Sequence, residues 1–148
     1  PVTDSDLRRL SSAGCDVSDC VGWVSVESFE SSYPDVRLND GYQYMTLRRL
    51  DDGTCVLARE EEGNLRCSVH GSHPIVCRLY PYDEKNGGVR GRKLCRRTSR
   101  PREDLRSLGL LRRGEAEEYS RKVSLWNRSA FVRRGREDFL KYLLAGRL

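Results

Sequence analysis

The stretch that decides the fold is residues 53–82, GTCVLAREEEGNLRCSVHGSHPIVCRLYPY, which holds three of the six cysteines of the chain. With the next cysteine included, Cys55, Cys67, Cys77 and Cys95 follow the spacing C-x11-C-x9-C-x17-C. Four thiolates can hold a four-cysteine zinc site or a cubane iron–sulfur cluster. Sulfur ligands also select these metals over magnesium or calcium. The spacing is compatible with a metal centre, but it lacks the paired C-x2-C knuckles of zinc ribbons.

Six cysteines are also compatible with three disulfides, so the redox compartment has to be considered. The sequence shows no secretory signal. Thiols of cytoplasmic proteins stay reduced, and clustered reduced cysteines favour metal binding or catalysis. We therefore expect a cytoplasmic protein whose cysteines bind a metal rather than pair as disulfides.

The composition sets the size of the core and the classes of partner. The 148 residues fit one domain, and with 37% hydrophobic and 33% charged residues the core is modest. No run approaches the roughly 18 apolar residues of a membrane span, so no membrane contact is expected. The net charge of +5 and the arginine-rich stretch 90–102 leave nucleic-acid binding as an alternative. Aromatic residues do not interleave with these charges as they do in stacking platforms.

The N-terminal part of the chain predicts two helices. The first runs from a cap at Thr3 to a stop at Gly14, and Asp6 completes its capping box. The second is expected over residues 16–29, because valines and Cys20 recur there at helical spacing. On this stripe Cys20 fits a small core residue better than a metal ligand.

The rest of the chain predicts short strands and then helices. The Asp52-Gly53 pair is a hairpin signal, and Pro74 suits the first turn of a helix. A final helix after Gly135 should bury Phe139, Leu140, Leu143 and Leu144. The expected segments are strands at 42–47, 55–58 and 65–69, a helix at 74–80, a loop or hairpin at 83–93, and helices at 102–111, 114–133 and 136–145.

These segments define the expected fold class, a small α+β and mostly helical protein. We expect a single metal-binding domain over residues 1–148, with an irregular β-hairpin region around the cysteine cluster. The cysteine motif occupies 53–97, and helices fill 101–148. The cysteine motif in the middle of the chain has few large apolar residues. A bound metal there would stabilise the segment in place of a hydrophobic core.

Residues 67–82 resemble the signature of the YkgJ-type cysteine-cluster family, which is described as zinc- or iron-chelating. That signature runs Cys, two residues, an aromatic, two residues, Arg-Pro, two residues, Cys-Arg, one residue, an aromatic and Pro. The preceding Gly53-Thr-Cys55 is similar to the strand that precedes it. The resemblance covers roughly residues 1–97 and is most specific over 53–82.

The chain departs from the family pattern in two respects. The family carries a compact cysteine group, ending in a Cys-Cys pair, just before its Pro-Val-Thr-like segment, and this sequence has no such group. The usual aromatic is His70 and the usual arginine is His73. The spacing Cys67-x2-His70 is ligand-like by itself, whereas the resemblance makes both histidines non-ligands.

The predicted function is metal binding by Cys55, Cys67, Cys77 and Cys95, with a structural, redox or metal-handling role. The resemblance favours an iron–sulfur cluster, of the 4Fe–4S type, over zinc. Arg78 is expected to interact with the bound group, since a guanidinium there can offset the charge of several thiolates. The resemblance leaves open an iron–sulfur enzyme, either an oxidoreductase or a protein lysine methylase. Enzymatic activity is therefore left undecided, and the expected partner is an unidentified protein.

Overall fold

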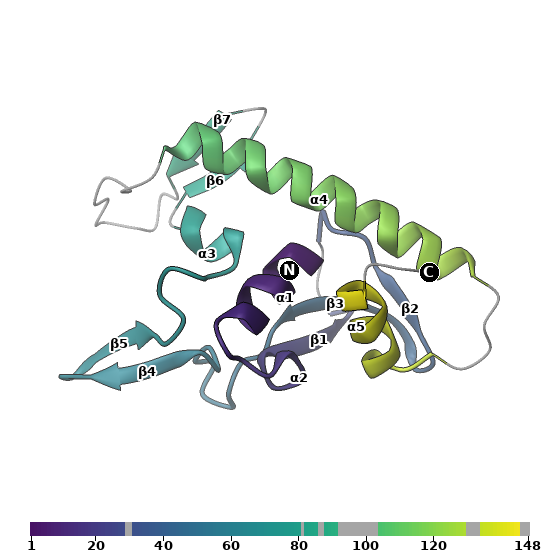
Figure 1. The fold of residues 1–148 in the computed structure, drawn as a ribbon, viewed down its shortest axis with the longest axis horizontal. Helices are drawn as coiled ribbons and strands as arrows, with labels where there is room; N and C mark the ends of the chain where they lie inside the picture. The colour runs from purple at the N-terminus through teal and green to yellow at the C-terminus, as the bar shows by residue number, and fades with distance from the viewer. Residues whose placement is uncertain (29–30, 81, 86–87, 92–103, 130–133, 146–148) are drawn as a thin grey trace.

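The computed structural model describes residues 1–28, 31–80, 82–85, 88–91, 104–129 and 134–145. Over these residues the protein has an α+β fold, in which helices pack on a three-stranded antiparallel sheet and two β-hairpins extend the structure (Figure 1). The elements are α1 (Asp4–Ser12), α2 (Val17–Cys20), β1 (Val21–Ser25), β2 (Val36–Leu38), β3 (Gly41–Leu47), β4 (Ala58–Glu61), β5 (Asn64–Cys67), α3 (Ile75–Leu79), β6 (Tyr82–Lys85), β7 (Gly88–Gly91), α4 (Leu105–Arg128) and α5 (Arg136–Ala145).

The first helix has the predicted ends. The Thr3 side chain accepts from the Asp6 backbone N–H, and the Asp6 carboxylate accepts from the Thr3 backbone, so the capping box is present. Gly14 has φ +82°, the left-handed conformation that suits glycine after a helix. Local sequence chemistry alone thus sets both ends of α1.

The second predicted helix is wrong beyond Cys20. Only Val17–Cys20 is helical, and the chain continues as strand β1. A Cβ on Gly22 would lie 3.0 Å from the Arg48 Cα, so this glycine lets the backbone of residue 48 approach closely. Valine and tryptophan in this run also suit a strand. Sheet pairing therefore overrides the helical spacing of the valines.

The sheet has the strand order β1-β3-β2. Val21 pairs with Leu47, and the register continues to Ser25 opposite Gln43. On the other side of β3, Leu38 faces Gly41 across a two-residue turn, which adds a strand that the sequence did not predict. The 42–47 strand is confirmed within β3.

The main core lies between this sheet and helices α1, α4 and α5. Leu7 of α1 packs in one cluster with Val36 and Met45 of the sheet, Val123 of α4 and Phe139 of α5. Each of these side chains is at most 2% exposed. Burial of this amount of apolar surface is the main force that holds the helices on the sheet.

Helix α4 is continuous, whereas the sequence predicted two helices with a break near Gly114 and an end near residue 133. Gly114 lies within the helix, and the Asp104 side chain caps its start by accepting from Arg106 and Ser107 backbone N–H groups. The helix ends at Arg128. A single glycine costs a helix only about 1 kcal/mol, which the packing of so long a helix outweighs.

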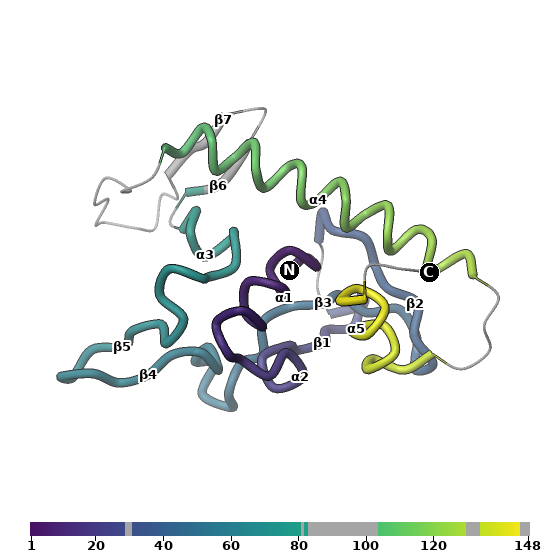
Figure 2. Tube along the Cα trace, viewed as in Figure 1, coloured from purple at the N-terminus to yellow at the C-terminus, as the bar shows by residue number. Residues whose placement is uncertain are grey.

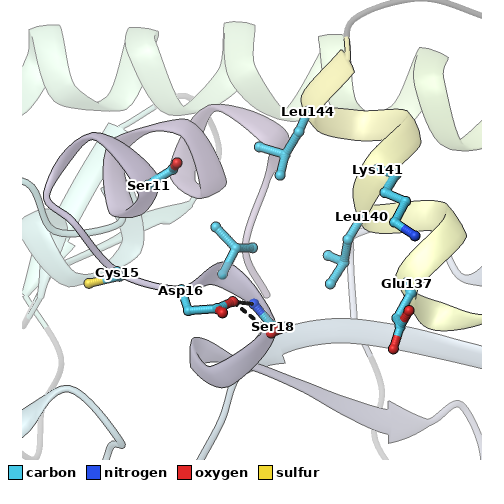
Figure 3. Close-up of a pocket in the computed structure, with 9 residues that line it drawn as sticks. Ser11, Cys15, Asp16, Ser18, Glu137, Leu140, Lys141 and Leu144 are labelled. Atoms are coloured by element: carbon cyan, nitrogen blue, oxygen red, sulfur yellow. Dashed lines mark hydrogen bonds between the residues drawn. The ribbon is translucent and has the colours of Figure 1, made fainter.

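A pocket of about 510 Å³ separates the α1–α2 segment from α5 (Figure 3). Phe139, Leu140 and Leu143 of α5 are buried as predicted, but Leu144 is 36% exposed, so its predicted burial is wrong. Leu140 and Leu144 line the pocket opposite Val17. Leu144 thus borders open space instead of core.

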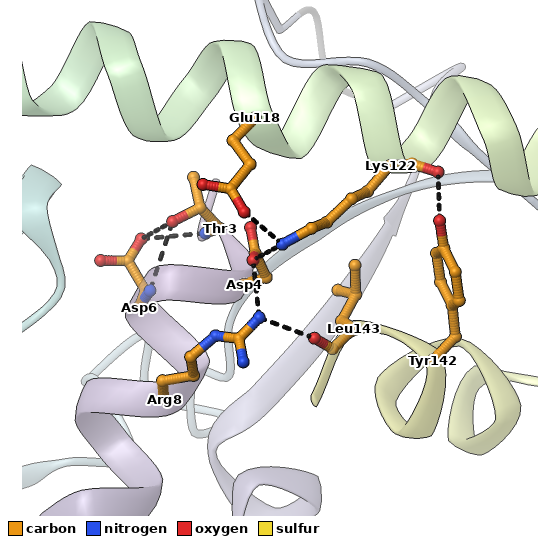
Figure 4. Close-up of polar contacts among 8 residues, drawn as sticks. All are labelled: Thr3, Asp4, Asp6, Arg8, Glu118, Lys122, Tyr142 and Leu143. Carbon is orange, nitrogen blue, oxygen red and sulfur yellow. Dashed lines mark hydrogen bonds and ion pairs between the residues drawn. The ribbon is translucent and has the colours of Figure 1, made fainter. Parts of the chain in front are cut away.

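Polar contacts tie α1 to α4 and α5 (Figure 4). The Asp4 carboxylate, 1% exposed, accepts from Lys122 of α4 and from Arg8, 3.2 Å away. Arg8 also donates to the Leu143 carbonyl at 3.2 Å, and the Tyr142 hydroxyl donates to the Lys122 carbonyl at 3.0 Å. The three helices that cover the sheet are therefore joined by charge as well as by packing.

The two hairpins differ in their surroundings. In the tube view, β4 and β5 project away from the sheet and helices (Figure 2). Strands β6 and β7 pair with each other, which confirms the hairpin option within residues 83–93, and β7 contacts α4. The predicted strand 65–69 is realised as Asn64–Cys67. Of the predicted strand 55–58, Cys55 forms an isolated bridge with Arg49 and Ala58 begins β4.

Candidate metal centre

Cys55 lies at the end of a tight turn that follows β3. The Leu50 N–H donates to the Thr54 carbonyl at 2.8 Å, and the Gly53 N–H donates to the Leu50 carbonyl at 2.8 Å. Gly53 has φ +82°, which the predicted Asp-Gly turn signal explains. The turn returns the chain so that Cys55 lies opposite Arg49.

Cys67 ends the β4–β5 hairpin, close to Cys55. The hairpin turns through Glu62 and Gly63, with φ of 51° and 74°, and its register places Ala58 opposite Cys67. The Ala58 N–H in turn donates to the Cys55 carbonyl at 2.9 Å. The base of one hairpin therefore holds both cysteines on the cluster formed by Leu10, Cys20, Leu57 and Val69.

Cys77 lies in the short helix α3, as the Pro74 signal predicted. Ile75 and Leu79 of α3 are buried against Leu108 of α4, which leaves Cys77 on the exposed side. Pro74 provides no side-chain cap. The carboxylate of Asp6, from α1, instead accepts from the Ile75 N–H at 2.7 Å.

Asp6 is therefore a hub between three helices. It is fully buried and also accepts from the Arg9 guanidinium at 2.5 Å. Arg9 forms two further hydrogen bonds, both 2.6 Å, with the Glu115 carboxylate of α4. The hydrogen bonds that Arg9 donates to Glu115, and then to Asp6, raise the pKa of Arg9, although burial opposes them. The capping box predicted the local bonds of Asp6, but no local signal predicts its bond to Ile75.

The electrostatics around Cys77 show which thiols are its neighbours. Burial raises the pKa of the Cys77 thiol to about 11, and the thiols of Cys55 and Cys67 and then the Asp6 carboxylate contribute in the same direction. The residue as a whole is exposed, so its surroundings are dense on one side only. Three of the four predicted ligands thus lie within electrostatic range of one another.

The three thiols are neighbours rather than an assembled ligand sphere. Among the described residues, no group of three or more Cys, His, Asp or Glu side chains is placed to hold a metal ion. All five cysteines that the structure describes are free thiols. Cys95, the fourth predicted ligand, and most of the basic stretch 90–102 lie outside the described residues. The donor chemistry fits zinc or an iron–sulfur cluster.

The two histidines follow the hairpin. Their rings stack edge to face with centroids 4.9 Å apart, and His70 is exposed while His73 is half-buried. Arg78 is half-buried at the end of α3, adjacent to Cys77 in the chain. The role of Arg78 beside a bound group stays a prediction.

Two more cysteines lie apart from these three. Cys20 is 6% exposed, which confirms its predicted place in the core. Cys15 packs against the cluster that contains Cys20, which the sequence did not predict. The signal was present as a C-x4-C spacing, but a helix over 16–29 would not have suggested that packing.

The chain matches no protein-family model, no curated protein and no solved structure. In the part of the chain that the structure describes, no helix combines the length and the apolar character that crossing a membrane requires.

Proposed function

We propose that the protein binds a metal centre through Cys55, Cys67 and Cys77, with Cys95 as the fourth ligand. The bound group is an iron–sulfur cluster of the 4Fe–4S type, with zinc as the second choice. The resemblance to the YkgJ-type family is the reason for this order. The centre would be structural, or would carry electrons or metal. The protein acts in the cytoplasm, and its partner is another protein.

One observation carries this proposal, the mutual proximity of three free thiols from separate segments. Cys55 follows a turn, Cys67 ends a hairpin and Cys77 lies in a helix, yet the first two raise the pKa of the third. Thiolates are strong ligands for zinc and iron. Three thiols from separate segments near one another supply the sulfur donors that a soft metal selects.

Metal binding at this site releases protons. A thiol with a pKa of about 11 is protonated near neutral pH, so a metal that binds Cys77 must displace a proton. Burial is the main cause of the raised pKa, and repulsion from the neighbouring thiolates adds to it. A shared cation would replace that repulsion by attraction to each thiolate. The affinity for metal should therefore rise with pH until Cys77 is ionised.

The test is the metal and acid-labile sulfide content of anaerobically purified protein, with its visible spectrum. We expect iron with sulfide and broad charge-transfer absorption. Single serine variants of Cys55, Cys67 and Cys77 should lose most of the metal, and Cys15→Ser, a partly exposed cysteine outside the group, should retain it. Zinc without sulfide would assign a zinc site to the same ligands. No metal in any preparation would overturn the proposal.

A further inference from the structure

The two histidines of the chain are side chains of a metal-binding type that the proposed function does not use. His70 and His73 are the only histidines in the sequence. Their rings lie edge to face, with centroids 4.9 Å apart, in the loop between the β4–β5 hairpin and α3. Neutral imidazole is the commonest metal ligand in proteins, so two rings this close to each other form a candidate site of their own.

A tight turn brings the two rings together. The Ser72 N–H donates to the Val69 carbonyl at 2.9 Å, and Gly71 between them has φ +97°. This is the pattern of a type II turn, in which the third residue has a positive φ and is usually glycine. His70 occupies the second position of the turn, and His73 follows directly after its last residue. The backbone therefore sets how far apart the two rings can lie.

The loop that carries this turn joins β5 to α3 and is held at both ends (Figure 1). At its start, the Ser68 N–H donates to the Leu57 carbonyl at 2.8 Å, and the Val69 side chain is buried. At its end, the Ile75 N–H donates to the buried Asp6 carboxylate at 2.7 Å. A loop that is already held loses less conformational freedom when its side chains bind a ligand, which favours binding.

The spacing of the rings fits two ligands of one ion. With a metal–nitrogen bond of about 2.0–2.1 Å, two imidazoles on the same ion have ring centroids roughly 4.5–5.2 Å apart at square-planar or tetrahedral angles. The observed 4.9 Å lies inside this interval. His70 is exposed and His73 is half-buried, so an ion can reach the pair from solvent. Among the described residues, no third Cys, His, Asp or Glu joins the two histidines in a metal-binding group, so water would fill the remaining positions.

We propose that His70 and His73 together bind one divalent transition-metal ion, such as zinc, at a site separate from the candidate metal centre. Imidazole suits zinc, copper and nickel, whereas magnesium and calcium prefer oxygen ligands. Two neutral protein ligands hold the ion more weakly than several charged thiolates do, because fewer bonds form and no ligand charge offsets that of the ion. The site is therefore exchangeable, and it does not depend on whether the thiols bind a metal.

The ring signals of the two histidines test the proposal, because isotope-labelled histidine reports on these two residues alone. The reduced full chain, with labelled histidine ring nitrogens, is titrated anaerobically with zinc and followed by NMR. We expect one ring nitrogen of each histidine to change its chemical shift over the same interval of zinc concentration. Signals that stay unchanged up to about 1 mM free zinc, or a response of one histidine alone, would overturn the proposal.

Variants separate this pair from the thiols. In His70→Gln the His73 signal should need at least about tenfold more zinc, and in His73→Gln the His70 signal should behave in the same way, because two linked ligands bind one ion more tightly than either alone. Cys77→Ser is the matched control and should respond as the wild type does. Loss of the histidine response in Cys77→Ser would assign the histidines to the thiol centre. An unchanged zinc affinity of His73 in His70→Gln would show that the rings only stack, and either result contradicts the proposal.

Discussion

At the scale of single residues, the Asp6 carboxylate connects separate parts of the fold. Its buried carboxylate accepts from the backbone of Thr3 and Ile75 and from Arg9. An amide in its place would turn one donor group toward these donors, and the Arg9 guanidinium would lose one of its two carboxylate partners. The residue thus connects the stability of α1 to the position of Cys77.

The first prediction is that Asp6→Asn lowers the free energy of unfolding by about 3 kcal/mol. It should also lower the pKa of Cys77, because the Asp6 charge is one of the causes that raise it. Urea unfolding measures the first effect, and the pH dependence of Cys77 alkylation measures the second. Asp51→Asn, at an exposed carboxylate, is the control and should change neither quantity.

The second prediction concerns alkaline pH. Burial, and then the neighbouring Cys15, raise the pKa of Cys20 from its ordinary value of 9.0 to about 11. Above about pH 9 the unfolded chain gives up this proton while the folded protein keeps it, so folding stability falls as the pH rises toward about 11. Below pH 9 the contribution is fully present.

Replacing Cys20 by Ala should therefore flatten the alkaline loss of stability, by on the order of 2 kcal/mol near pH 11. The measurement is urea unfolding of the reduced protein at several pH values, for wild type and variant. Parallel pH curves for the two proteins would show that Cys20 does not titrate differently in the folded state.

At the scale of elements, local chemistry predicted helix ends better than it predicted long-range pairing. Thr3, Asp6 and Gly14 bound α1 as expected, because a capping box and a left-handed glycine act within one turn. The helix expected over 16–29 failed because β1 gains its hydrogen bonds from β3, whose paired residues lie 18 to 26 positions further along the chain. Valines at helical spacing are equally suited to a strand.

The candidate site follows the same pattern. A turn signal at Gly53 and a helix start at Pro74 predicted how the backbone presents Cys55 and Cys77. That Cys55, Cys67 and Cys77 are neighbours followed from the metal hypothesis, not from any local signal. The packing of Cys15 against the cluster that contains Cys20 was missed, since it depends on where the helix stops.

The third prediction uses the continuity of α4. A Cβ on Gly114 would meet no heavy atom within 4 Å, and the residue is exposed within the helix. Gly114→Ala should raise the free energy of unfolding by about 0.5–1 kcal/mol, since alanine favours the helix over the unfolded chain. Thermal or urea unfolding measures the change.

Gly22→Ala is the matched comparison for that substitution. Here the added methyl would lie 3.0 Å from the Arg48 Cα, a backbone atom that cannot easily move. We expect destabilisation of about 1 kcal/mol or more. If Gly114→Ala also destabilised the protein, a break in α4 at this position would be the better description.

At the scale of the whole molecule, the candidate metal centre lies where separate parts of the fold meet. Cys55 and Cys67 extend from the sheet side, while α3 is held between Asp6 of α1 and Leu108 of α4. A metal bound by these cysteines would crosslink both sides. Binding to the folded state alone stabilises it by mass action.

The fourth prediction is that zinc, used as a probe on the reduced protein, raises the free energy of unfolding by about 2.7 kcal/mol at a free concentration 100 times its dissociation constant. Cys77→Ser should remove most of this gain, and Cys15→Ser should keep it. The gain should shrink as the pH is lowered, because protons compete for the thiols. An equal gain in Cys77→Ser would place the zinc elsewhere.

The bond between Asp6 and Ile75 also orders events during folding. Its partners are 69 positions apart in the sequence, and a helix as short as α3 does not form by itself in water. Cys55 and Cys67 can meet early through a local hairpin, whereas Cys77 takes its place only after α1 and α4 have come together. A newly synthesised chain would thus acquire its complete set of ligands late, and loading with metal would report that the tertiary structure is finished.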